Sequence, residues 1–487
     1  MKSKDNRHKK NLAAAQLNIV SKKLFTGIFL VGMILSATQV EALAQTFLWT
    51  RQFGTTSSDF ANAITTDSSG IYVAGDTYGT LSGQTGAGMI DAFVRKSDAD
   101  GNELWTRQFG SSSTYTDNDD HAYAITADSS GIYIAGSAGG TLPGQANAEL
   151  KDAFVRKYDA DGNELWTRQF GTTTHVQLGT TITDVAYAII ADSSGIYVAG
   201  RAGAPLADLN TPAQYLAFVR KFDADGNELW TRQFGTDTTY YVDAKGITAD
   251  SSGVYIAGSA GAHLPGQTSA GMIDAFVCKL DADGNELWIR QFGTTSHDFA
   301  YAITAVSSGI YVAGYTNGAL PGQTYSGEND AFVRKFDADG NELWTRQFGT
   351  TGYEQVRGIT ADSSGIFVDG YTTGTLPGQI SAGMSDAFVR KYDADGNELW
   401  TRQFGSSSTF NDDGSSSSHL DKLDYAYAIT ADSSGLFIAG NTGGSLPGQT
   451  YLGMTDAYIS KISFNEAPRV GRAVHMGSLV PLLLGND

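Results

Sequence analysis

The chain has 487 residues, of which 58 are glycine (about 12%, against a usual ~7%) and only 17% are charged, which predicts dense turns and few long solvent-exposed helices. Hydrophobic residues at 41% and aromatic residues at 11% suffice for a core, so the composition favours an all-β fold and excludes general disorder. The formal net charge is −19, or −24 without the basic first 44 residues, and such a field repels phosphate backbones and anionic lipid; we expect no nucleic acid as a partner.

The first 44 residues have the features of an export signal. Seven Lys or Arg residues precede an apolar run of 12 residues, Leu24 to Leu35, and Ala42-Leu43-Ala44 offers the small-x-small pattern of a cleavage site. We expect residues 1–44 to be a signal peptide and the mature protein to be periplasmic, at the cell surface or extracellular. A spanning helix needs ~20 apolar residues, so we expect no membrane span after cleavage. An uncleaved anchor is the alternative.

One segment, Leu-Trp-Thr-Arg-Gln-Phe-Gly, recurs seven times along the chain, with isoleucine in place of threonine at Ile289. Three further short segments, each bounded by turn residues, always lie between two copies, which is typical of strands. The sequence therefore predicts a repeating four-stranded unit. The seven tryptophans are Trp49, Trp105, Trp166, Trp230, Trp288, Trp344 and Trp400.

The second unit illustrates the four predicted strands. The first strand, residues 122–127, ends in Asp128-Ser129-Ser130-Gly131, which fits a tight turn into the second strand, residues 132–135. The third strand, residues 152–158, follows a loop with Leu-Pro-Gly-Gln and leads through Asp-Ala-Asp-Gly-Asn into the fourth, residues 164–170. The turn glycine should adopt a left-handed conformation. Its six copies, predicted as structural residues with the tryptophans, are Gly101, Gly162, Gly226, Gly284, Gly340 and Gly396.

The order of strands at the two ends predicts a closed ring. Residues 47–53 supply a fourth strand without its preceding three, and the last unit, which ends at residue 462, lacks a fourth strand. Bulky side chains on both faces of the strands require each sheet to lie between neighbouring sheets. We therefore predict a seven-bladed β-propeller over residues 46–463, closed by the N-terminal strand in the last blade.

The repeat resembles the SBBP family of bacterial β-propeller repeats. The resemblance is carried by an Asp-x-x-Gly-Asn hairpin, a Leu-Trp strand and an Asp-Ser-Ser-Gly turn, here Asp98 to Asn102, Leu104-Trp105 and Asp128 to Gly131, and it covers about residues 46 to 463. The resemblance implies export and a propeller, and it implies no defined activity.

Sequence variation is concentrated on one face of the predicted ring. The turns after the first and third strands share one face and hold 24 of the 52 acidic residues. The other face carries the length variation, at residues 111–120, 172–183, 201–215 and 406–423. Because loops on a rigid frame are usual sites of specificity, we place a binding surface for an unknown protein or carbohydrate there. Drift in solvated loops is the alternative, and we expect a monomer.

No catalytic, cofactor or metal site is predicted. The paired aspartates of the hairpin, as in Asp98 and Asp100, suggest structural calcium, but EF-hand spacing is not met and hairpin chemistry is favoured. The segment of residues 98–105 also resembles the tryptophan-docking motif of quinoproteins, but it is one residue shorter and lacks the threonine before glycine. The single cysteine, Cys278, excludes an internal disulfide and stands where most other repeats have an arginine.

The histidines stand singly, without metal-ligand spacing, at His8, His121, His175, His263, His297, His419 and His475. The sequence therefore predicts an exported, non-enzymatic binding or scaffold module. A propeller hydrolase or lyase acting on polysaccharide, with carboxylates from separate blades in the central channel, is the alternative. Residues 464–487 form a C-terminal tail that we predict to be disordered.

Overall fold

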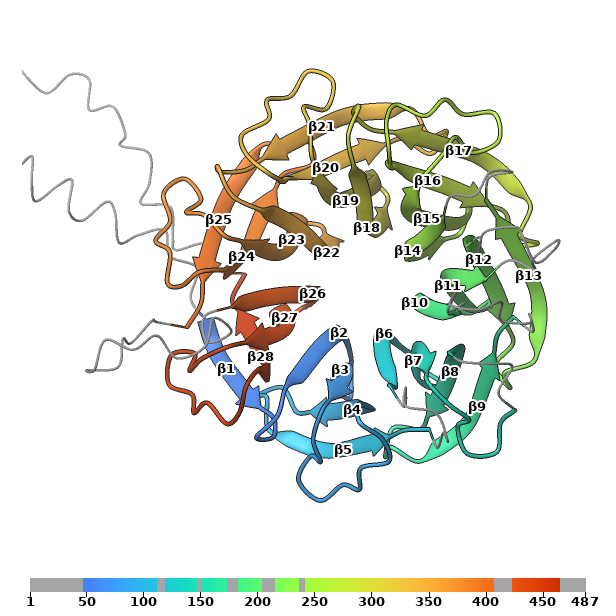
Figure 1. Ribbon diagram of the computed structural model, residues 1–487, viewed down its shortest axis with the longest axis vertical. Helices are drawn as coiled ribbons and strands as arrows, with labels where there is room; N and C mark the ends of the chain where they lie inside the picture. Colours follow the sequence, from blue (N-terminus) through green and yellow to red (C-terminus); the bar gives the residue numbers. More distant parts are fainter. Residues whose placement is uncertain are drawn as a thin grey trace, which may run out of the picture. The chain divides into compact units, whose positions relative to one another are not determined.

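The strands form a ring of seven antiparallel four-stranded sheets in the computed structural model, which describes residues 47–111, 119–146, 151–172, 183–203, 215–235, 241–406 and 423–464. The sheets stand as blades around a central axis, with the first strand of each unit innermost (Figure 1). Phe47–Ile462 makes up one compact unit. No helix occurs in these described ranges, so none there could cross a membrane. The predicted all-β propeller is confirmed.

Each blade takes its strands consecutively from the chain, except the seventh. The strands are, in blade 1, β2 (Asp59–Asp67), β3 (Gly70–Thr77), β4 (Asp91–Ser97) and β5 (Glu103–Phe109); in blade 2, β6 (His121–Asp128), β7 (Gly131–Ala138), β8 (Asp152–Tyr158) and β9 (Glu164–Phe170); in blade 3, β10 (Val185–Asp192), β11 (Gly195–Gly203), β12 (Tyr215–Phe222) and β13 (Glu228–Phe234); in blade 4, β14 (Val242–Asp250), β15 (Gly253–Ala260), β16 (Asp274–Leu280) and β17 (Glu286–Phe292); in blade 5, β18 (Asp298–Val306), β19 (Gly309–Thr316), β20 (Asp330–Phe336) and β21 (Glu342–Phe348); in blade 6, β22 (Glu354–Asp362), β23 (Gly365–Thr372), β24 (Asp386–Tyr392) and β25 (Glu398–Phe404); and in blade 7, β26 (Asp424–Asp432), β27 (Gly435–Thr442), β28 (Asp456–Ile462) and β1 (Phe47–Phe53).

The N-terminal strand closes the ring as predicted. β1 pairs antiparallel with β28, with Phe47 opposite Ile462, Arg51 opposite Ile459 and Phe53 opposite Ala457. The hydroxyls of Thr50 and Ser460 are hydrogen-bonded across this seam at 2.9 Å. Blade 7 therefore combines the two ends of the described chain, and its outer edge is covered as in the other six blades.

The core lies between neighbouring blades. Every residue of β8 is buried, so this strand presents apolar side chains to both flanking sheets. One cluster joins Tyr72 and Val94 of blade 1 to Ile134 and Phe154 of blade 2. Each blade buries apolar area against the two blades that flank it, and this burial stabilises the ring.

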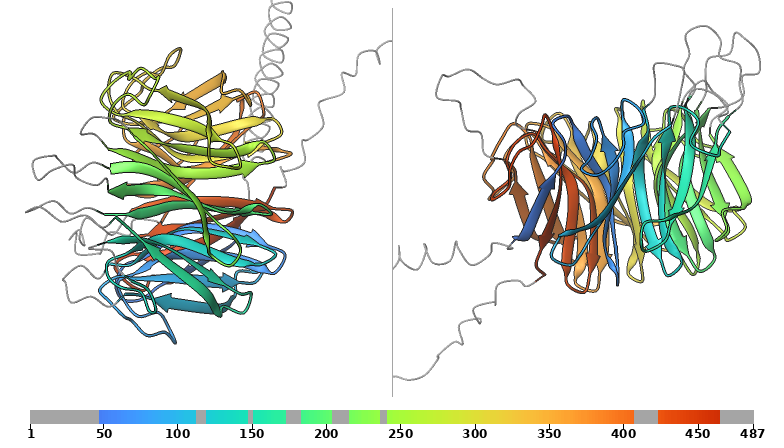
Figure 2. Two further views of the ribbon diagram at one scale, coloured as in Figure 1. Left: turned by 90° about the vertical axis from the view of Figure 1, so that its right-hand side faces the viewer. Right: turned by 90° about the horizontal axis from the view of Figure 1, so that it is seen from below.

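The ring has two unlike faces. Side views show the strands of each blade running between them (Figure 2). We call the face with the turns at residues 67–70 and 98–102, and their counterparts, the turn face. The opposite face, which carries the connections at residues 54–58 and 78–90 and their counterparts, we call the loop face. Several predictions made for the ends and for the enlarged loops fall on residues outside the described ranges: 1–46, 112–118, 173–182, 204–214, 407–422 and 465–487.

Candidate functional site

The repeated tryptophans and glycines join each blade to the next at the turn face. Trp105 Nε1 donates a hydrogen bond to the carbonyl oxygen of Ala160 at 3.2 Å, and Arg107 Nε donates to that of Gly162 at 2.8 Å. Gly162 has φ +78°, and a Cβ there would lie 2.9 Å from the Trp105 ring. The same tryptophan contact recurs from Trp49 to Ala99, Trp166 to Ala224, Trp230 to Ala282, Trp288 to Ala338 and Trp344 to Ala394.

Trp400 is the exception at the seam. It precedes blade 7, in which β28 is not followed by an Asp-Ala-Asp-Gly-Asn turn. Its ring packs against Phe367 of the same blade, with ring centroids 6.2 Å apart, and the other six tryptophans make the same contact with the aromatic residue at that position of their blades. The contact between blades 6 and 7 is supplemented by Phe47, whose ring lies 4.8 Å from that of Phe404. Six of the predicted structural tryptophans therefore donate a hydrogen bond to a turn of the next blade, and Trp400 makes no such bond within the described ranges.

The paired aspartates of the hairpin use their first carboxylate inside the turn. Asp98 Oδ1 accepts hydrogen bonds from the backbone N–H groups of Asp100 and Asn102, at 3.0 and 2.8 Å, and Oδ2 accepts one from Asn102 Nδ2 at 3.0 Å. These bonds from Asn102 hold the pKa of Asp98 below its usual value. Within the described ranges, no three His, Cys, Asp or Glu side chains gather as metal ligands. Structural calcium at this hairpin stays a prediction.

Pairs of acidic residues lie close together at the loop face, but they are buried. Asp59 and Asp456 both flank Gly54, where a Cβ would lie 2.6 and 3.1 Å from their oxygens. Thr55 donates to Asp59 from its backbone N–H at 2.6 Å, and Gln52 Nε2 donates to Asp456 at 2.8 Å. Neither carboxylate is exposed, and burial raises both pKa values. Equivalent pairs are Asp91 with Asp120, Asp152 with Asp184, Asp274 with Asp298, Asp330 with Glu354 and Asp386 with Asp424.

These pairs hold the connections between blades and have no access to a substrate. At the junction of blades 3 and 4 the pair is replaced by two apolar residues, Leu216 and Val242. Because both carboxylates are lost together, no buried acid is left beside an apolar partner. Glycoside hydrolysis needs two accessible carboxylates beside the sugar, which these buried pairs do not offer.

Cys278 is part of a similar paired exchange. In blade 2, Arg156 Nε donates to Thr167 Oγ1 at 2.8 Å, and Arg156 Nη1 lies 3.4 Å from Glu164. In blade 4 the residues in register at these positions are Cys278 and Ile289, both buried. The apolar pair replaces the polar pair, and burial raises the pKa of the Cys278 thiol, which is typical of an unreactive cysteine.

A second cluster, which the sequence did not predict, lies at the central axis. The innermost strand of every blade has a β-bulge at the same position. The bulged residues differ from blade to blade: Asn62, Tyr123, Tyr187, Lys245, Tyr301, Arg357 and Tyr427. All seven are only partly buried. We call them, with their neighbours on the innermost and second strands, the axial cluster.

The axial cluster is continuous across the axis. Burial and, in smaller measure, Tyr301 of blade 5 raise the pKa of Tyr187 in blade 3. The ring of Tyr123 in blade 2 lies 5.7 Å from that of Tyr187. Since side chains of non-adjacent blades act on one another, they converge on the axis in the half of the ring near the loop face, where the innermost strands begin.

Acidic and basic side chains are paired in blades 1 to 4. Asp76 Oδ1 accepts a hydrogen bond from Asn62 Nδ2 at 2.6 Å and lies 3.4 Å from His121 Nδ1. Asp243 lies 3.7 Å from Arg201 Nε and 3.5 Å from Lys245 Nζ. Burial lowers the pKa of Lys245 to about 8, against the opposing effect of Asp243. Its ammonium lies 3.2 Å from the centre of the Tyr187 ring.

Aromatic side chains surround an arginine in blades 5 to 7. The Arg357 guanidinium lies 4.3 Å from the centre of the Tyr301 ring and 5.7 Å from that of Tyr371. The Tyr371 ring in turn meets that of Tyr425 edge-on at 4.5 Å, and Tyr425 stacks on Tyr427. This part of the axial cluster therefore presents one cation among several rings and phenol hydroxyls.

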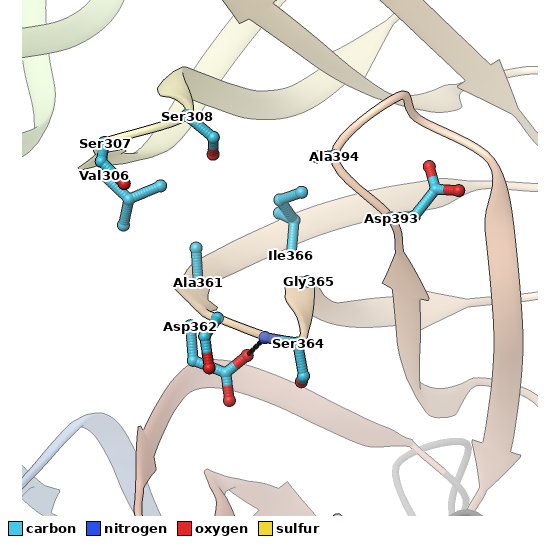
Figure 3. A pocket seen from close by; sticks show the side chains of 11 residues that line it. Val306, Ser307, Ser308, Ala361, Asp362, Ser364, Gly365, Ile366, Asp393 and Ala394 are labelled. Atoms are coloured by element: carbon cyan, nitrogen blue, oxygen red, sulfur yellow. Dashed lines mark hydrogen bonds between the residues drawn. The ribbon is translucent and has the colours of Figure 1, made fainter.

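A cavity of about 570 Å³ lies on the turn face between blades 5 and 6. Figure 3 shows Ser307 and Ser308 on one side of it and the turn from Asp362 to Ser364 on the other. It lies at the one turn in which valine, Val306, replaces the usual aspartate. Asp362 Oδ1 accepts a hydrogen bond from the backbone N–H of Ser364 at 2.7 Å, so the cavity offers hydroxyls but no pair of free carboxylates.

The remaining predicted residues are placed as follows. His121 belongs to the axial cluster, His297 stacks on Phe299 with 6.3 Å between ring centres, and His263 is exposed. A space of about 60 Å³ lies beside Asp184, Arg220 and Gln233 in blade 3. In this blade residues 201–215 stand in place of the usual Leu-Pro-Gly-Gln loop. The predicted binding loops lie largely outside the described ranges, so their part in a site stays a prediction.

The axial cluster was missed because the predictions rested on what the repeats share. Its residues are those by which the repeats differ. In most innermost strands they follow a buried alanine, as Tyr123 follows Ala122, and in blade 6 Arg357 follows Val356 at the same position. Tyrosine, lysine, arginine and asparagine at one position of otherwise matching strands are a signal that an alignment of the seven copies would contain.

The fold and its repeats define a seven-bladed β-propeller. The SBBP beta-propeller repeat family matches residues 48–81, which confirms the resemblance at that repeat. The regulatory protein FlaEY of Caulobacter vibrioides is 30% identical over 164 residues, 30% of this chain and 17% of that protein. The uncharacterized WD repeat-containing protein L264 of Acanthamoeba polyphaga mimivirus is 27% identical over 177 residues, 30% of this chain and 13% of that protein. The chain thus spans less than a fifth of either relative's length.

Solved propellers are similar at low sequence identity. The Pan2 WD40 domain of Neurospora crassa is 11% identical, with 87% of this chain and 97% of that chain covered and a TM-score of 0.44. An exo-1,5-alpha-L-arabinanase from a bovine ruminal metagenomic library is also 11% identical, with 61% and 99% covered and a TM-score of 0.30.

Proposed function

We propose that this protein is an exported, non-enzymatic binding module that captures a protein or carbohydrate at the cell envelope or outside the cell. A rigid propeller with varied loops is suited to binding or scaffolding. The observation that carries the proposal is the distribution of differences between repeats. The turn face is nearly uniform, whereas the axial cluster and the connections of the loop face change from blade to blade.

The enlarged connections adjoin the axial cluster along the chain. Residues 111–120 lead directly into His121, and residues 201–215 begin at Arg201, which lies 5.9 Å from the Tyr187 ring. The loops and the axial side chains would therefore form one binding surface on the loop face. The buried acid pairs of the loop face do not offer accessible carboxylates for a catalytic site there.

The test of binding replaces residues 407–422 with a short Gly/Ser linker in the full chain and keeps Ser406, which donates hydrogen bonds to the buried Asp424. Wild type and variant are presented with purified envelope polysaccharides and with immobilised envelope and medium proteins. We expect the variant to lose capture while its melting temperature stays that of the wild type. A variant with the Asp-Ser-Ser-Gly turn of blade 1 replaced is the matched control and should keep capture. Unchanged capture by the linker variant contradicts the proposal.

Export has its own test. Cell fractionation and mass spectrometry of the mature protein should give an N-terminus at Gln45, because residues 42–44 fit a cleavage site. Protein that is retained with residues 1–44 in the membrane fraction would favour the uncleaved anchor.

The second candidate is a lyase acting on an acidic polysaccharide. It is favoured by Lys245, whose pKa of about 8 leaves part of its amine neutral near pH 7 and able to accept a proton. In such an elimination the amine takes the proton next to the sugar carboxylate, a C=C bond forms as the C–O bond to the leaving sugar breaks, and the resulting ammonium returns the proton to the leaving oxygen. Release of unsaturated sugars, followed by ultraviolet absorbance and lost in Lys245→Met, would establish it in place of the binding module.

A further inference from the structure

We propose that the part of the axial cluster formed by Tyr301, Gln355, Arg357, Tyr371, Tyr427 and Asn441, the axial sector, binds a carboxylate-bearing sugar residue, a uronate, of an acidic polysaccharide. The inference rests on the proposed function, because it takes the loop face as the binding face. It adds the chemical class of the ligand and the residue that selects it.

Arg357 carries a positive charge without a carboxylate partner in the described part of the chain. None of the ion pairs there includes it, and its Nε has no hydrogen-bond partner. A guanidinium remains charged at any physiological pH, and a charge withdrawn from water is costly unless it is paired. The Tyr301 and Tyr371 rings attract the cation but cannot neutralise it. A bound carboxylate would.

The other axial cations, Arg201 and Lys245, share one carboxylate partner. Arg201 and Lys245 both lie within 4 Å of Asp243, whose carboxylate is 6% exposed. Arg357 in blade 6 differs from both, because it has no carboxylate within 4 Å in the described part of the chain.

Two amides beside Arg357 also have unpaired atoms. Gln355 is 8% exposed and Asn441 is 3% exposed, and Gln355 Oε1 and Asn441 Oδ1 have no hydrogen-bond partner within the described ranges. They belong to one place, because Gln355 is in register with Tyr371, Asn441 with Tyr425, and the two tyrosine rings are 4.5 Å apart. A sugar hydroxyl can both donate and accept, so it satisfies an amide whichever way the group is turned.

The combination favours an acidic sugar over an acidic peptide. A uronate carries one carboxylate for the single unpaired cation and hydroxyls for the amides. Its apolar ring face can pack on the tyrosine rings, because a sugar and a tyrosine both combine an apolar face with polar hydroxyls. The acidic hairpins belong to the turn face, at the other end of the strands, and their repulsion is screened over about 8 Å at physiological ionic strength.

The test titrates the full mature chain with oligogalacturonate by calorimetry. The ligand controls are the methyl-esterified oligosaccharide, which lacks the charge, and poly-glutamate, which carries carboxylates without sugar. Loss of a charge-assisted hydrogen bond should weaken binding of oligogalacturonate by Arg357→Gln at least about tenfold. Arg357→Lys should lose less. Arg402→Gln, which removes an arginine over the Phe47 ring on the outer circumference, is the matched control and should bind as wild type.

Gln355→Met should weaken binding without changing charge, and it tests the site even if Arg357→Gln fails to fold. Equal binding by wild type and Arg357→Gln, binding of the methyl ester as tightly as the acid, or tighter Arg357-dependent binding of poly-glutamate would each overturn the uronate assignment. If oligogalacturonate does not bind while the loop face still captures another partner, the inference fails and the proposed function stands. If both fail, the proposed function fails as well.

Discussion

The turn glycines are constrained both by their own backbone and by a ring from the preceding blade. The six predicted glycines have φ between +77° and +80°, a conformation that costs other residues roughly 1–2 kcal/mol. At Gly162 a Cβ would also meet the Trp105 ring at 2.9 Å. The tryptophan position and the glycine position are therefore parts of one contact.

We expect Gly162→Ala to lower the free energy of unfolding by about 2–5 kcal/mol, the sum of the backbone cost and of overpacking against the indole. Gly144→Ala is the matched control, because Gly144 has φ +75° but nothing within 4 Å of its would-be Cβ. It should lose only about 1–2 kcal/mol. Urea unfolding of both variants measures the difference, and equal losses would show that the Trp105 contact does not limit the side chain.

Asp369 is a second coupled position. Six blades have alanine at this point of the second strand, whereas blade 6 has a carboxyl that is fully buried and without a hydrogen-bond partner among side chains. It faces Gly358, where a Cβ would lie 2.3 Å from Asp369 Oδ1. Blade 5 has alanine at both positions, Ala302 and Ala313. In blade 6 the missing side chain of Gly358 leaves room for the larger side chain of Asp369.

The Gly358→Ala and Asp369→Ala pair should be strongly non-additive. Alone, Gly358→Ala overpacks the carboxyl and should cost about 1–3 kcal/mol. In the Asp369→Ala background it restores the alanine pair of blade 5 and should be neutral or stabilising. Chemical denaturation of the four proteins of the cycle gives the coupling energy. Additive effects would mean that the two side chains do not share the space.

At the scale of elements, the ring depends on one strand pair that joins distant parts of the chain. β1 and β28 meet across about 400 residues, whereas the other third and fourth strands are joined by a short hairpin. Because loop-closure entropy grows with loop length, a covalent bond at the seam restricts the unfolded chain more than the same bond inside a blade.

Thr50→Cys with Ser460→Cys places a disulfide at the seam, and Ile289→Cys places one with Cys278 at the same register in blade 4. We expect the seam bond to raise the free energy of unfolding by about 3 kcal/mol more than the hairpin bond, since roughly five doublings of loop length separate them. Melting curves before and after reduction measure both increments. A larger increment in blade 4 would contradict the entropic argument.

The strand order and closure could be predicted because each depends on a pattern along the chain. Turn residues bounded every strand, and the unpaired strand at residues 47–53 matched the incomplete blade at the other end. The axial cluster could not be predicted in this way. Whether Arg357 points to the axis or into a sheet depends on the bulge between Val356 and Gly358, and its lack of a carboxylate partner depends on which residues the other blades bring there.

For the whole molecule, buried acids make stability depend on pH. Burial raises the pKa of Asp369 to about 8 and that of Asp424 to about 6, from 3.8. Between about pH 4 and these values, the folded protein keeps protons that the unfolded chain has released. The free energy of unfolding should therefore fall as the pH rises through this window.

We expect a lower melting temperature at pH 8 than at pH 5. Asp369→Asn, which carries no ionisable group, should remove the part of the decline between pH 6 and pH 8. Differential scanning calorimetry across the pH range measures both effects. A melting temperature that rises toward pH 8 in the wild type would contradict the expected direction of this pH dependence.

The hairpin aspartates predict the effect of removing calcium. Because Asp98 is occupied by donors of its own turn, we expect EGTA to leave the melting temperature unchanged. Calcium added back in excess serves as the control. A fall of several degrees with EGTA, reversed by calcium, would establish structural calcium and show that the carboxylates rearrange around it.

The pairing of Phe47 with Ile462 brings both entry points of the ring to the same spot on the turn face. A tag, a fused enzyme or a solid support attached through either point would leave the opposite face unobstructed. Biosensor chips that carry the protein by one end should therefore all present the side on which we place recognition, and double-ended attachment should cost nothing in accessibility.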